Sequence, residues 1–287
     1  MTGVRDLAEL VRAPAALTVP GDVLAGAAAA GFPTGARWLG SAVGSVCLYW
    51  AGMALNDYAD RDLDRDERPE RPIPSGRVGP GTALAVATAL TAAGVGAAAL
   101  SGGRRALRTA LPLAGTVWLY DLALKNTPAG PVGMAAARSL NVLMGSGPRV
   151  EGLVPALAVG AHTLGLTALS LGEVHGIRRE VPLAALAGTG TIAAAVAAAV
   201  RRPSPVPVWL STAGFCAAYA ATVGGPQSAA VQQPTGGRVR AAVGAGILGF
   251  VPLQAALTAR TGAVRSALAL AAALPAARLL VRKVAAT

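Results

Sequence analysis

The chain has 287 residues, of which 53% are hydrophobic and only 14% are charged, and its mean hydropathy is +0.52. These values exclude an ordinary soluble domain and indicate an integral membrane protein. The net charge of +11 does not indicate a nucleic-acid partner, because the basic residues lie in short segments between apolar runs rather than in one patch.

Ten apolar runs follow one another along the chain, each about as long as the ~20 residues that cross the core of a bilayer. They cover residues 15–31, 37–58, 81–101, 104–122, 131–147, 153–172, 182–200, 206–223, 239–258 and 264–281. Ala and Gly dominate these runs, as expected where helices pack closely in lipid. We predict an all-α integral membrane protein whose single domain, residues 1–287, is a bundle of nine or ten transmembrane helices.

The first run contains Pro20, Gly21 and Asp22 and follows a stretch of mixed charges, so we interpret it as the first membrane helix and not as a cleavable signal sequence. The distribution of Lys and Arg outside the runs favours a cytoplasmic N-terminus. We therefore expect a multi-pass protein of the cell membrane. Its N-terminus and the polar segment 56–77 would lie on the cytoplasmic side.

Several polar residues lie inside the runs, where an ionisable side chain is costly and is a functional candidate by default. Asp22 either faces the interior of the bundle for function or is paired with an Arg near the interface. Arg138 and Asn141 share one face of the fifth run at i and i+3, and either reach a substrate or form a structural interhelical hydrogen bond. We interpret His162 as a hydrogen-bonded packing residue.

The segment 56–77 reads NDYADRDLDRDERPERPIPSGR and holds seven of the fourteen acidic residues of the chain. If the second helix continues through Asp64, then Asn56, Asp60 and Asp64 follow one another at i,i+4 and lie along one face. Like charges at this spacing repel, so the pattern favours a cation among the carboxylates. Mg²⁺ prefers oxygen ligands and often shares them with phosphates.

Arginines follow the carboxylates directly, at Arg68 and Arg71. Guanidinium groups bind phosphate through two parallel hydrogen bonds. Together, the carboxylates and arginines predict a Mg²⁺ and diphosphate site for a lipid substrate at the membrane surface. A solvated, salt-bridged loop is the alternative interpretation.

The order of these residues resembles a known motif. NDxxDxxxD followed by RxxRPxxxG resembles the first aspartate-rich motif of the UbiA superfamily of intramembrane prenyltransferases. "RAPAALTVP", from Arg12, is similar to the start of the first helix in that family, and "YDLALK" is similar to its Tyr-x-x-x-Leu-Lys element, with Tyr120 and Lys125. The resemblance implies a helical, mostly nine-span fold and the transfer of a polyprenyl group from its diphosphate to an unidentified aromatic or lipid acceptor.

The resemblance also implies roles for individual residues. The expected catalytic residues are Asp57, Asp60, Asp64 and Lys125. The expected Mg²⁺ ligands are Asn56, Asp57, Asp60, Asp64 and Glu173. The expected contacts of the diphosphate are Asn56, Arg12, Arg68, Arg71, Tyr120, Arg138 and Asn141.

The chain departs from the family pattern after the sixth run. A second motif, DxxxD or close to it, is usual there, but this chain has "SLGEVHGIRRE", with Ile177 four residues after Glu173. His175 and Glu180 are the other candidates for this motif. With this departure the chain looks most like the EboC branch of UbiA-like proteins, which is known from a bacterial operon implicated in moving a metabolite precursor out of the cytoplasm.

The altered second motif keeps an alternative function open, a non-catalytic carrier, transport component or scaffold that binds an isoprenoid. The CDP-alcohol phosphotransferases also use spaced aspartates, but the DG and AR steps of that class do not appear here. Finally, the segment GGPQSAAVQQPTGG, residues 224–237, has the composition of a flexible loop, and we expect a loop there.

Overall fold

The computed structural model describes residues 3–200 and 203–273, and all regular structure in them is helical. The helices are α1 (Val4–Leu10), η1 (Ala13–Thr18, a 3-10 helix), α2 (Val19–Ala29), α3 (Ala36–Ala59), α4 (Arg61–Glu67), α5 (Pro80–Leu119), η2 (Tyr120–Leu124, a π-helix), α6 (Gly130–Ser146), η3 (Val150–Gly152, a 3-10 helix), α7 (Leu153–Ser170), α8 (Glu180–Ala198), α9 (Val206–Gln232) and α10 (Gly236–Ala259). A last helix covers Val264–Ala273. The all-α prediction is confirmed.

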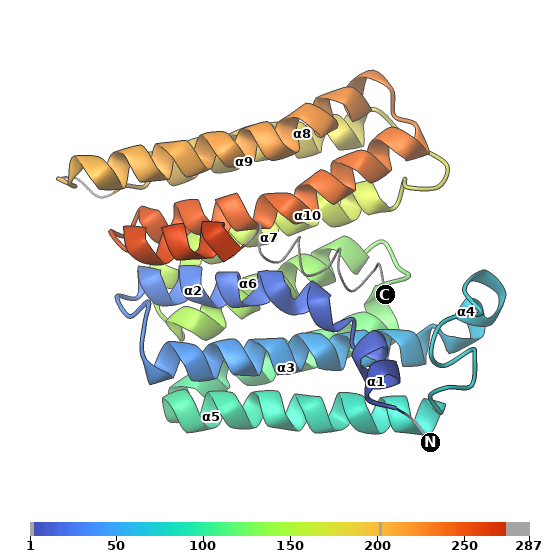
Figure 1. Ribbon diagram of the computed structural model, residues 1–287. Coiled ribbons are helices and arrows are strands. Elements are labelled where there is room, and N and C mark those ends of the chain that lie inside the picture. Colours follow the sequence, from blue (N-terminus) through green and yellow to red (C-terminus); the bar gives the residue numbers. More distant parts are fainter. Residues whose placement is uncertain (1–2, 201–202, 274–287) are drawn as a thin grey trace.

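The long helices run side by side as one bundle, with the short helices α1 and α4 at one end (Figure 1). We call this end the motif end. The connections from α7 to α8 and from α9 to α10 also lie there (Figure 1). Segments that are far apart in the sequence therefore lie at the same end of the bundle (Figure 1).

Helix α5 is two antiparallel helices joined at Gly103, which has φ 59° and ψ −150°. The indole nitrogen of Trp118 lies 3.0 Å from the hydroxyl of Thr91, 27 residues earlier. A straight helix would separate these residues by about 40 Å. The chain therefore reverses at Gly103, between the two predicted runs 81–101 and 104–122.

Six segments are long and apolar enough to cross a membrane: Ala36–Ala59, Pro80–Leu124, Val150–Ser170, Glu180–Ala198, Val206–Gln232 and Gly236–Ala259. The second of these contains the reversal at Gly103 and so holds two of the predicted runs. The remaining predicted runs coincide with shorter helices, and the last run, 264–281, ends outside the described residues. The count of nine or ten spans stays a prediction.

The loop expected at residues 224–237 is wrong for most of its length, because α9 continues to Gln232. Val223, Gln227 and Ala230 follow one another at i, i+4 and i+7, and all three are buried. The hydroxyl of Thr189 in α8 donates to the side-chain oxygen of Gln227 over 2.9 Å. Tertiary packing of this face thus outweighs the loop-like composition of the segment.

Small residues let the helix backbones approach closely, as the Ala and Gly content predicts. Where α6 crosses α2, a side chain on Gly145 would overlap the backbone of Val23, and one on Gly26 would overlap the backbone of Val142. Only glycine fits at these two positions. This contact fixes α2, and with it the N-terminal segment, against the rest of the bundle.

Candidate functional site

The acidic motif, which we define as residues 56–64, lies where α3 ends and α4 begins, at the motif end of the bundle. The sequence predicts one helix through Asp64, but α3 ends at Ala59 because Asp60, with φ −91° and ψ 3°, departs from helical geometry. The backbone N–H of Asp60 still donates to the oxygen of Asn56 over 2.9 Å, and that of Asp64 to the oxygen of Asp60 over 2.8 Å. Backbone hydrogen bonds of the helical i to i−4 type therefore lie on both sides of the junction.

Asp57 and Asp64 are joined by a shared arginine. Arg71 Nη1 lies 3.3 Å from Asp57 Oδ1 and 2.6 Å from Asp64 Oδ2. Arg12 Nη2 contacts the same oxygen of Asp57 at 2.7 Å, and Arg68 lies 3.5 Å from Asp64. Asp57 is 3% exposed and Asp64 is 1% exposed. The alternative interpretation, a solvated surface loop, does not fit carboxylates buried to this degree.

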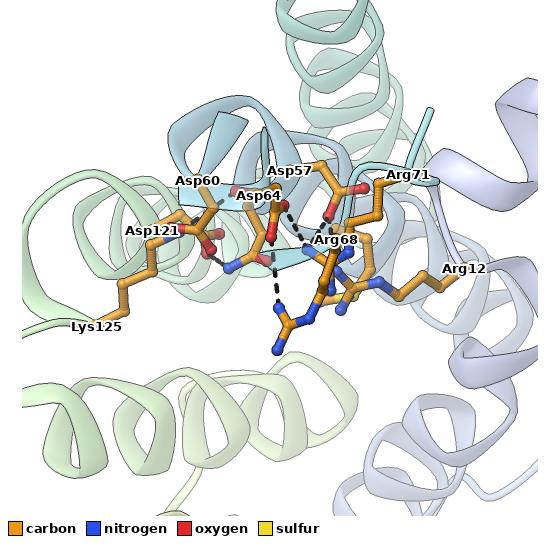
Figure 2. Close-up of polar contacts among 10 residues, drawn as sticks. Arg12, Asp57, Asp60, Asp64, Arg68, Arg71, Asp121 and Lys125 are labelled. Carbon is orange, nitrogen blue, oxygen red and sulfur yellow. Dashed lines mark hydrogen bonds and ion pairs between the residues drawn. The ribbon is translucent and has the colours of Figure 1, made fainter. Parts of the chain in front are cut away.

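A second group forms beside the first, around Asp60 (Figure 2). Lys125 Nζ lies 2.7 Å from Asp60 Oδ1 and donates to the backbone oxygen of Asn56 at 3.4 Å. The amide of Asn56 donates to Asp121 Oδ1 over 3.1 Å. This second group thus joins the end of α3 to the end of the fourth apolar run through one ion pair and two hydrogen bonds.

Asp121 is a further buried carboxylate of the site, 5% exposed, and it is not among the residues that the sequence motifs predict. It follows Tyr120 directly in "YDLALK", and an isolated acid near the end of an apolar run is the signal that points to it. The π-helical turn η2 sets its position, because the N–H of Lys125 donates to the oxygen of Tyr120 five residues earlier. Such turns recur at functional sites.

Carboxylate oxygens are the donors that Mg²⁺ prefers, and Asp57, Asp60 and Asp64 supply them at one end of the bundle. The donor set therefore fits this ion in its chemistry. In the part of the chain that the structure describes, no three His, Cys, Asp or Glu side chains are arranged around one point as a metal site requires. Arg71 and Lys125 lie against the carboxylates, so an ion would have to displace these contacts.

Arg138 and Asn141 contact Asp22 inside the bundle. Arg138 Nε lies 3.0 Å from Asp22 Oδ2, and the amide nitrogen of Asn141 donates to the same oxygen over 2.9 Å. Gln254 of α10 donates to Asp22 Oδ1 over 2.7 Å, and Ser45 of α3 donates to Asn141 Oδ1 over 2.6 Å. These contacts favour the interpretation in which Asp22 is paired with an Arg. They also favour structural interhelical hydrogen bonds for Arg138 and Asn141.

Glu173, His175 and Glu180 lie in or next to the connection from α7 to α8 at the motif end. The backbone oxygen of Glu173 accepts from Arg240 over 3.0 Å, and Glu180 lies 3.4 Å from Arg178. His175 and Glu180 are exposed. Among the described residues, no hydrogen bond or ion pair joins this connection to the acidic motif.

His162 is a hydrogen-bonded packing residue, as the sequence predicts. Its Nε2 lies 3.0 Å from the backbone oxygen of Gly246, and its Nδ1 lies 2.9 Å from the hydroxyl of Tyr219. It also lines a mainly apolar cavity of about 520 Å³ between α7, α8 and α9, with Thr189 and Gln227. The acidic motif contributes no residue to this cavity.

Comparison with known proteins places the chain in a family. The sequence profile of the UbiA prenyltransferase family matches residues 16–176, which is more than half of the chain. A digeranylgeranylglyceryl phosphate synthase of Halobacterium salinarum is 37% identical over 190 residues, which are 62% of this chain and 61% of that protein. The enzyme of the same name from Methanospirillum hungatei is 35% identical over 125 residues, 40% of this chain and 42% of that protein. In both cases the chain spans less than two thirds of the relative's length.

Solved structures with the same fold include two UbiA homologues. The apo structure of the Aeropyrum pernix homologue has a TM-score of 0.67 at 19% identity and covers 84% of this chain and 96% of that chain. The Archaeoglobus fulgidus homologue, solved with DMAPP and Mg²⁺, has a TM-score of 0.63 at 13% identity and covers 90% and 98%. At these identities the likeness concerns the fold.

Proposed function

Because the chain belongs to the UbiA prenyltransferase family, we propose that it is a Mg²⁺-dependent intramembrane prenyltransferase that moves a polyprenyl group from its diphosphate to an acceptor. The observation that carries the proposal is the cluster of buried carboxylates and cationic side chains at the motif end (Figure 2). Such a cluster at the end of an apolar bundle suits a ligand with a charged head and a hydrocarbon tail.

In this proposal, Asp57, Asp60 and Asp64 hold Mg²⁺, and Asn56, Asp121 and Glu173 are further candidate ligands. When bound, Mg²⁺ neutralises charge on the diphosphate. Four cationic side chains lie at the same carboxylates, Lys125, Arg12, Arg68 and Arg71. In the proposal they bind the diphosphate oxygens by charge-assisted hydrogen bonds. Tyr120 stays a predicted diphosphate contact.

The reaction breaks the C–O bond between the allylic carbon and the diphosphate, and both electrons of this bond leave with the diphosphate. A nucleophilic atom of the acceptor then bonds to the allylic carbon and loses its proton. The fixed cations Lys125, Arg68 and Arg71 favour charge on the leaving group, which is the usual role of positioned cations. Apolar helices around the prenyl chain keep water away from the reactive carbon.

The names of the relatives suggest the first substrates to try. They are called after digeranylgeranylglyceryl phosphate, so a geranylgeranyl donor and a phosphorylated glyceryl lipid acceptor are the reasonable starting pair. An aromatic acceptor is the second choice. We also propose that the motif end faces the cytoplasm, in line with the Lys and Arg distribution.

A non-catalytic isoprenoid-binding carrier or scaffold is the second candidate function. The observation that favours it is the connection from α7 to α8, where Ile177 stands at the place of the second expected acid. Glu173 in this connection makes its hydrogen bond to Arg240 through its backbone oxygen. A protein that binds the donor but does not ionise it would need only the first motif.

Diphosphate release distinguishes the two functions. Purified protein in detergent is given geranylgeranyl diphosphate, Mg²⁺ and a membrane extract as the source of acceptor, with Asp60→Ala as the control. We expect release that requires both Mg²⁺ and Asp60. Tight Mg²⁺-dependent binding without release, across several donors, would support the carrier and contradict the transferase.

A further inference from the structure

A cluster of exposed charges fixes the N-terminal helix to the loop that follows the acidic motif. Arg77 binds both carboxylate oxygens of Glu9, at 2.7 and 2.9 Å, and lies 2.9 Å from Asp6. Arg77 also donates hydrogen bonds to the backbone oxygen of Glu70 and to the hydroxyl of Ser75. We call the contacts of Arg77 with Asp6 and Glu9 the N-terminal clasp.

Apolar packing accompanies the clasp. Leu10 of α1 is fully buried in a cluster with Leu55 of α3 and with Ile73 and Val78 of the loop. Leu7 packs against the edge of the same cluster. The helix α1 is therefore held against α3 and the loop that follows the acidic motif by ion pairs and by burial of Leu10.

Arg12 begins the segment that follows α1, and its backbone is strained. It is the one non-glycine residue in the described chain with a positive φ, at 46°, with ψ 53°. Such a conformation costs free energy for a residue with a side chain and persists only where its surroundings impose it. The Arg12 side chain lies 2.7 Å from Asp57.

Both flanks of Arg12 are fixed, which accounts for the strain. On one side the clasp and Leu10 hold α1. On the other side the indole N–H of Trp50 donates to the backbone oxygen of Ala13 over 3.4 Å. If α1 were released, Arg12 would relax to an ordinary backbone conformation and its guanidinium would leave Asp57.

We infer that Arg77, Asp6 and Glu9 are positioning residues, which hold Arg12 in a strained conformation so that its guanidinium reaches Asp57 and the diphosphate bound there. The role of Arg12 toward diphosphate rests on the proposed function. The placement of Arg12 by the clasp does not rest on that function and can be tested separately.

The ionisation of the clasp is consistent with this role. A hydrogen bond from the backbone N–H of Gly3, together with Arg77, lowers the pKa of Asp6. The hydrogen bond from Arg77 lowers the pKa of Glu9, and the two carboxylates raise the pKa of Arg77 above its usual range. The clasp is therefore fully charged at neutral pH.

The test compares two ways of opening the clasp, Arg77→Ala from the loop side and Asp6→Ala with Glu9→Ala from the α1 side. We measure the affinity for inorganic pyrophosphate with Mg²⁺ by calorimetry, and hydrogen exchange of the backbone amides of residues 4–13. Each opened clasp, and Arg12→Ala likewise, is expected to weaken pyrophosphate binding about tenfold, which corresponds to one charge-assisted contact. Exchange of the Val11 and Arg12 amides should rise.

The decisive combination is an opened clasp in an Arg12→Ala background. If the clasp acts through Arg12, opening it there causes no further loss of pyrophosphate affinity. Arg77→Lys, which keeps the charge, should recover part of the affinity. The matched control is Arg65→Ala, because in the part of the chain that the structure describes Arg65 forms an exposed pair with Asp62 and no other ion pair. It should change neither measurement.

Three results would overturn the inference. The first is a loss from the opened clasp that adds in full to that of Arg12→Ala. The second is an effect of Arg77→Ala that the Asp6 and Glu9 variant lacks, because Arg77 would then act on its own loop. The third is unchanged exchange at Val11 and Arg12. Failure of the wild-type protein to bind pyrophosphate would instead contradict the proposed function, and the exchange measurement would still decide on the clasp.

Discussion

Asp57 and Asp64 both form ion pairs with the same guanidinium nitrogen of Arg71. One cation therefore compensates the charge of two carboxylates. The two carboxylate side chains are 4% and 1% exposed, and that of Arg71 is 20% exposed. Burial of two like charges is tolerable only with a cation between them. In the structure Arg71 supplies this cation, and in the proposed reaction Mg²⁺ shares the task.

Removing Arg71 should therefore destabilise the protein in a way that Mg²⁺ repairs. Loss of one partner of a buried pair costs about 3–5 kcal/mol, and the partial exposure of Arg71 places the expected loss at the lower end. Free carboxylates should bind Mg²⁺ more readily, and an ion at 100 times its Kd adds about 2.7 kcal/mol. We expect Arg71→Ala to unfold at a lower temperature in detergent and to regain more stability from Mg²⁺ than the wild type.

The control for this effect is again Arg65→Ala, whose pair with Asp62 is exposed and should contribute little. Thermal unfolding is recorded for the wild type and both variants, with Mg²⁺ and with a chelator. Equal Mg²⁺ shifts in the wild type and in Arg71→Ala would show that the ion and Arg71 do not compete for the carboxylates.

At the scale of elements, the reversal of α5 depends on one glycine. Gly103 combines φ 59° with ψ −150°, a region that is essentially restricted to glycine. No neighbouring atom lies within 4 Å of where its Cβ would be. Replacement by alanine therefore tests backbone conformation alone, and we expect Gly103→Ala to cost about 1–3 kcal/mol in unfolding free energy.

Gly96 in the same helix is the matched control, because it also has open space at its Cβ position but has no positive φ. Gly96→Ala should be neutral or stabilising by up to about 1 kcal/mol, since alanine favours a helix over glycine. A stability loss of the same size in both variants, measured by thermal or denaturant unfolding, would contradict the assignment of the reversal to Gly103.

The N-terminal clasp should open in acid. Asp6 and Glu9 have lowered pKa values in the folded protein, so their contribution is present above the ordinary carboxyl pKa and is lost as the pH falls through the lowered values. We expect the position of α1 to be constant from pH 5 to 8 and to change below about pH 4. Pulsed EPR distances between labels at Val4 and Gly81, with Cys47 and Cys216 replaced, measure this position.

In that experiment a single narrow distance is expected at neutral pH and a second, broader population in acid. Asp6→Asn with Glu9→Gln should give the broad population at every pH. A narrow distance that persists in the Asp6→Asn and Glu9→Gln variant, or a wild-type distance that already broadens near neutral pH, would exclude these carboxylates as the groups that hold α1.

How much the sequence predicts depends on the distance between the interacting residues. The apolar runs predict the helices well because length and hydropathy are local properties, and the spacing of Asp57, Asp60 and Asp64 predicts a common site for the same reason. The clasp joins residues 68 and 71 positions apart, which local patterns do not encode. Asp121 has no periodic partner, and α9 extends to Gln232 only because other helices bury it. The EboC-like branch stays a prediction.

At the scale of the whole molecule, one buried cluster ties the N-terminal part of the bundle to the C-terminal part. Asp22 of α2 contacts Arg138 and Asn141 of α6 and Gln254 of α10, which is 232 residues away. The Arg138 guanidinium also lies 4.0 Å from the centre of the Phe250 ring in α10. Because Asp22 and Arg138 compensate each other inside the apolar bundle, each should be costly to keep without the other.

A double-mutant cycle tests this compensation. Asp22→Ala leaves Arg138 buried without its charge partner, and Arg138→Met leaves Asp22 in the same state, so each should lower the unfolding free energy in detergent by roughly 3–5 kcal/mol. The double variant removes both charges and should lose much less than the sum of the two single losses. Strict additivity would mean that the pair does not carry the stability of this cluster.

The same three variants decide whether Arg138 also serves the diphosphate, as the sequence predicts. The structure gives Arg138 its hydrogen bonds and ion pair at Asp22, so a structural role predicts that the double variant, once folded, binds Mg²⁺ and pyrophosphate like the wild type. An equal loss of pyrophosphate affinity in Arg138→Met and in the folded double variant would instead show that Arg138 contacts the substrate. Asp22→Ala keeps Arg138. It therefore separates the effect of losing the arginine from the effect of disturbing α2, which follows the segment that begins at Arg12.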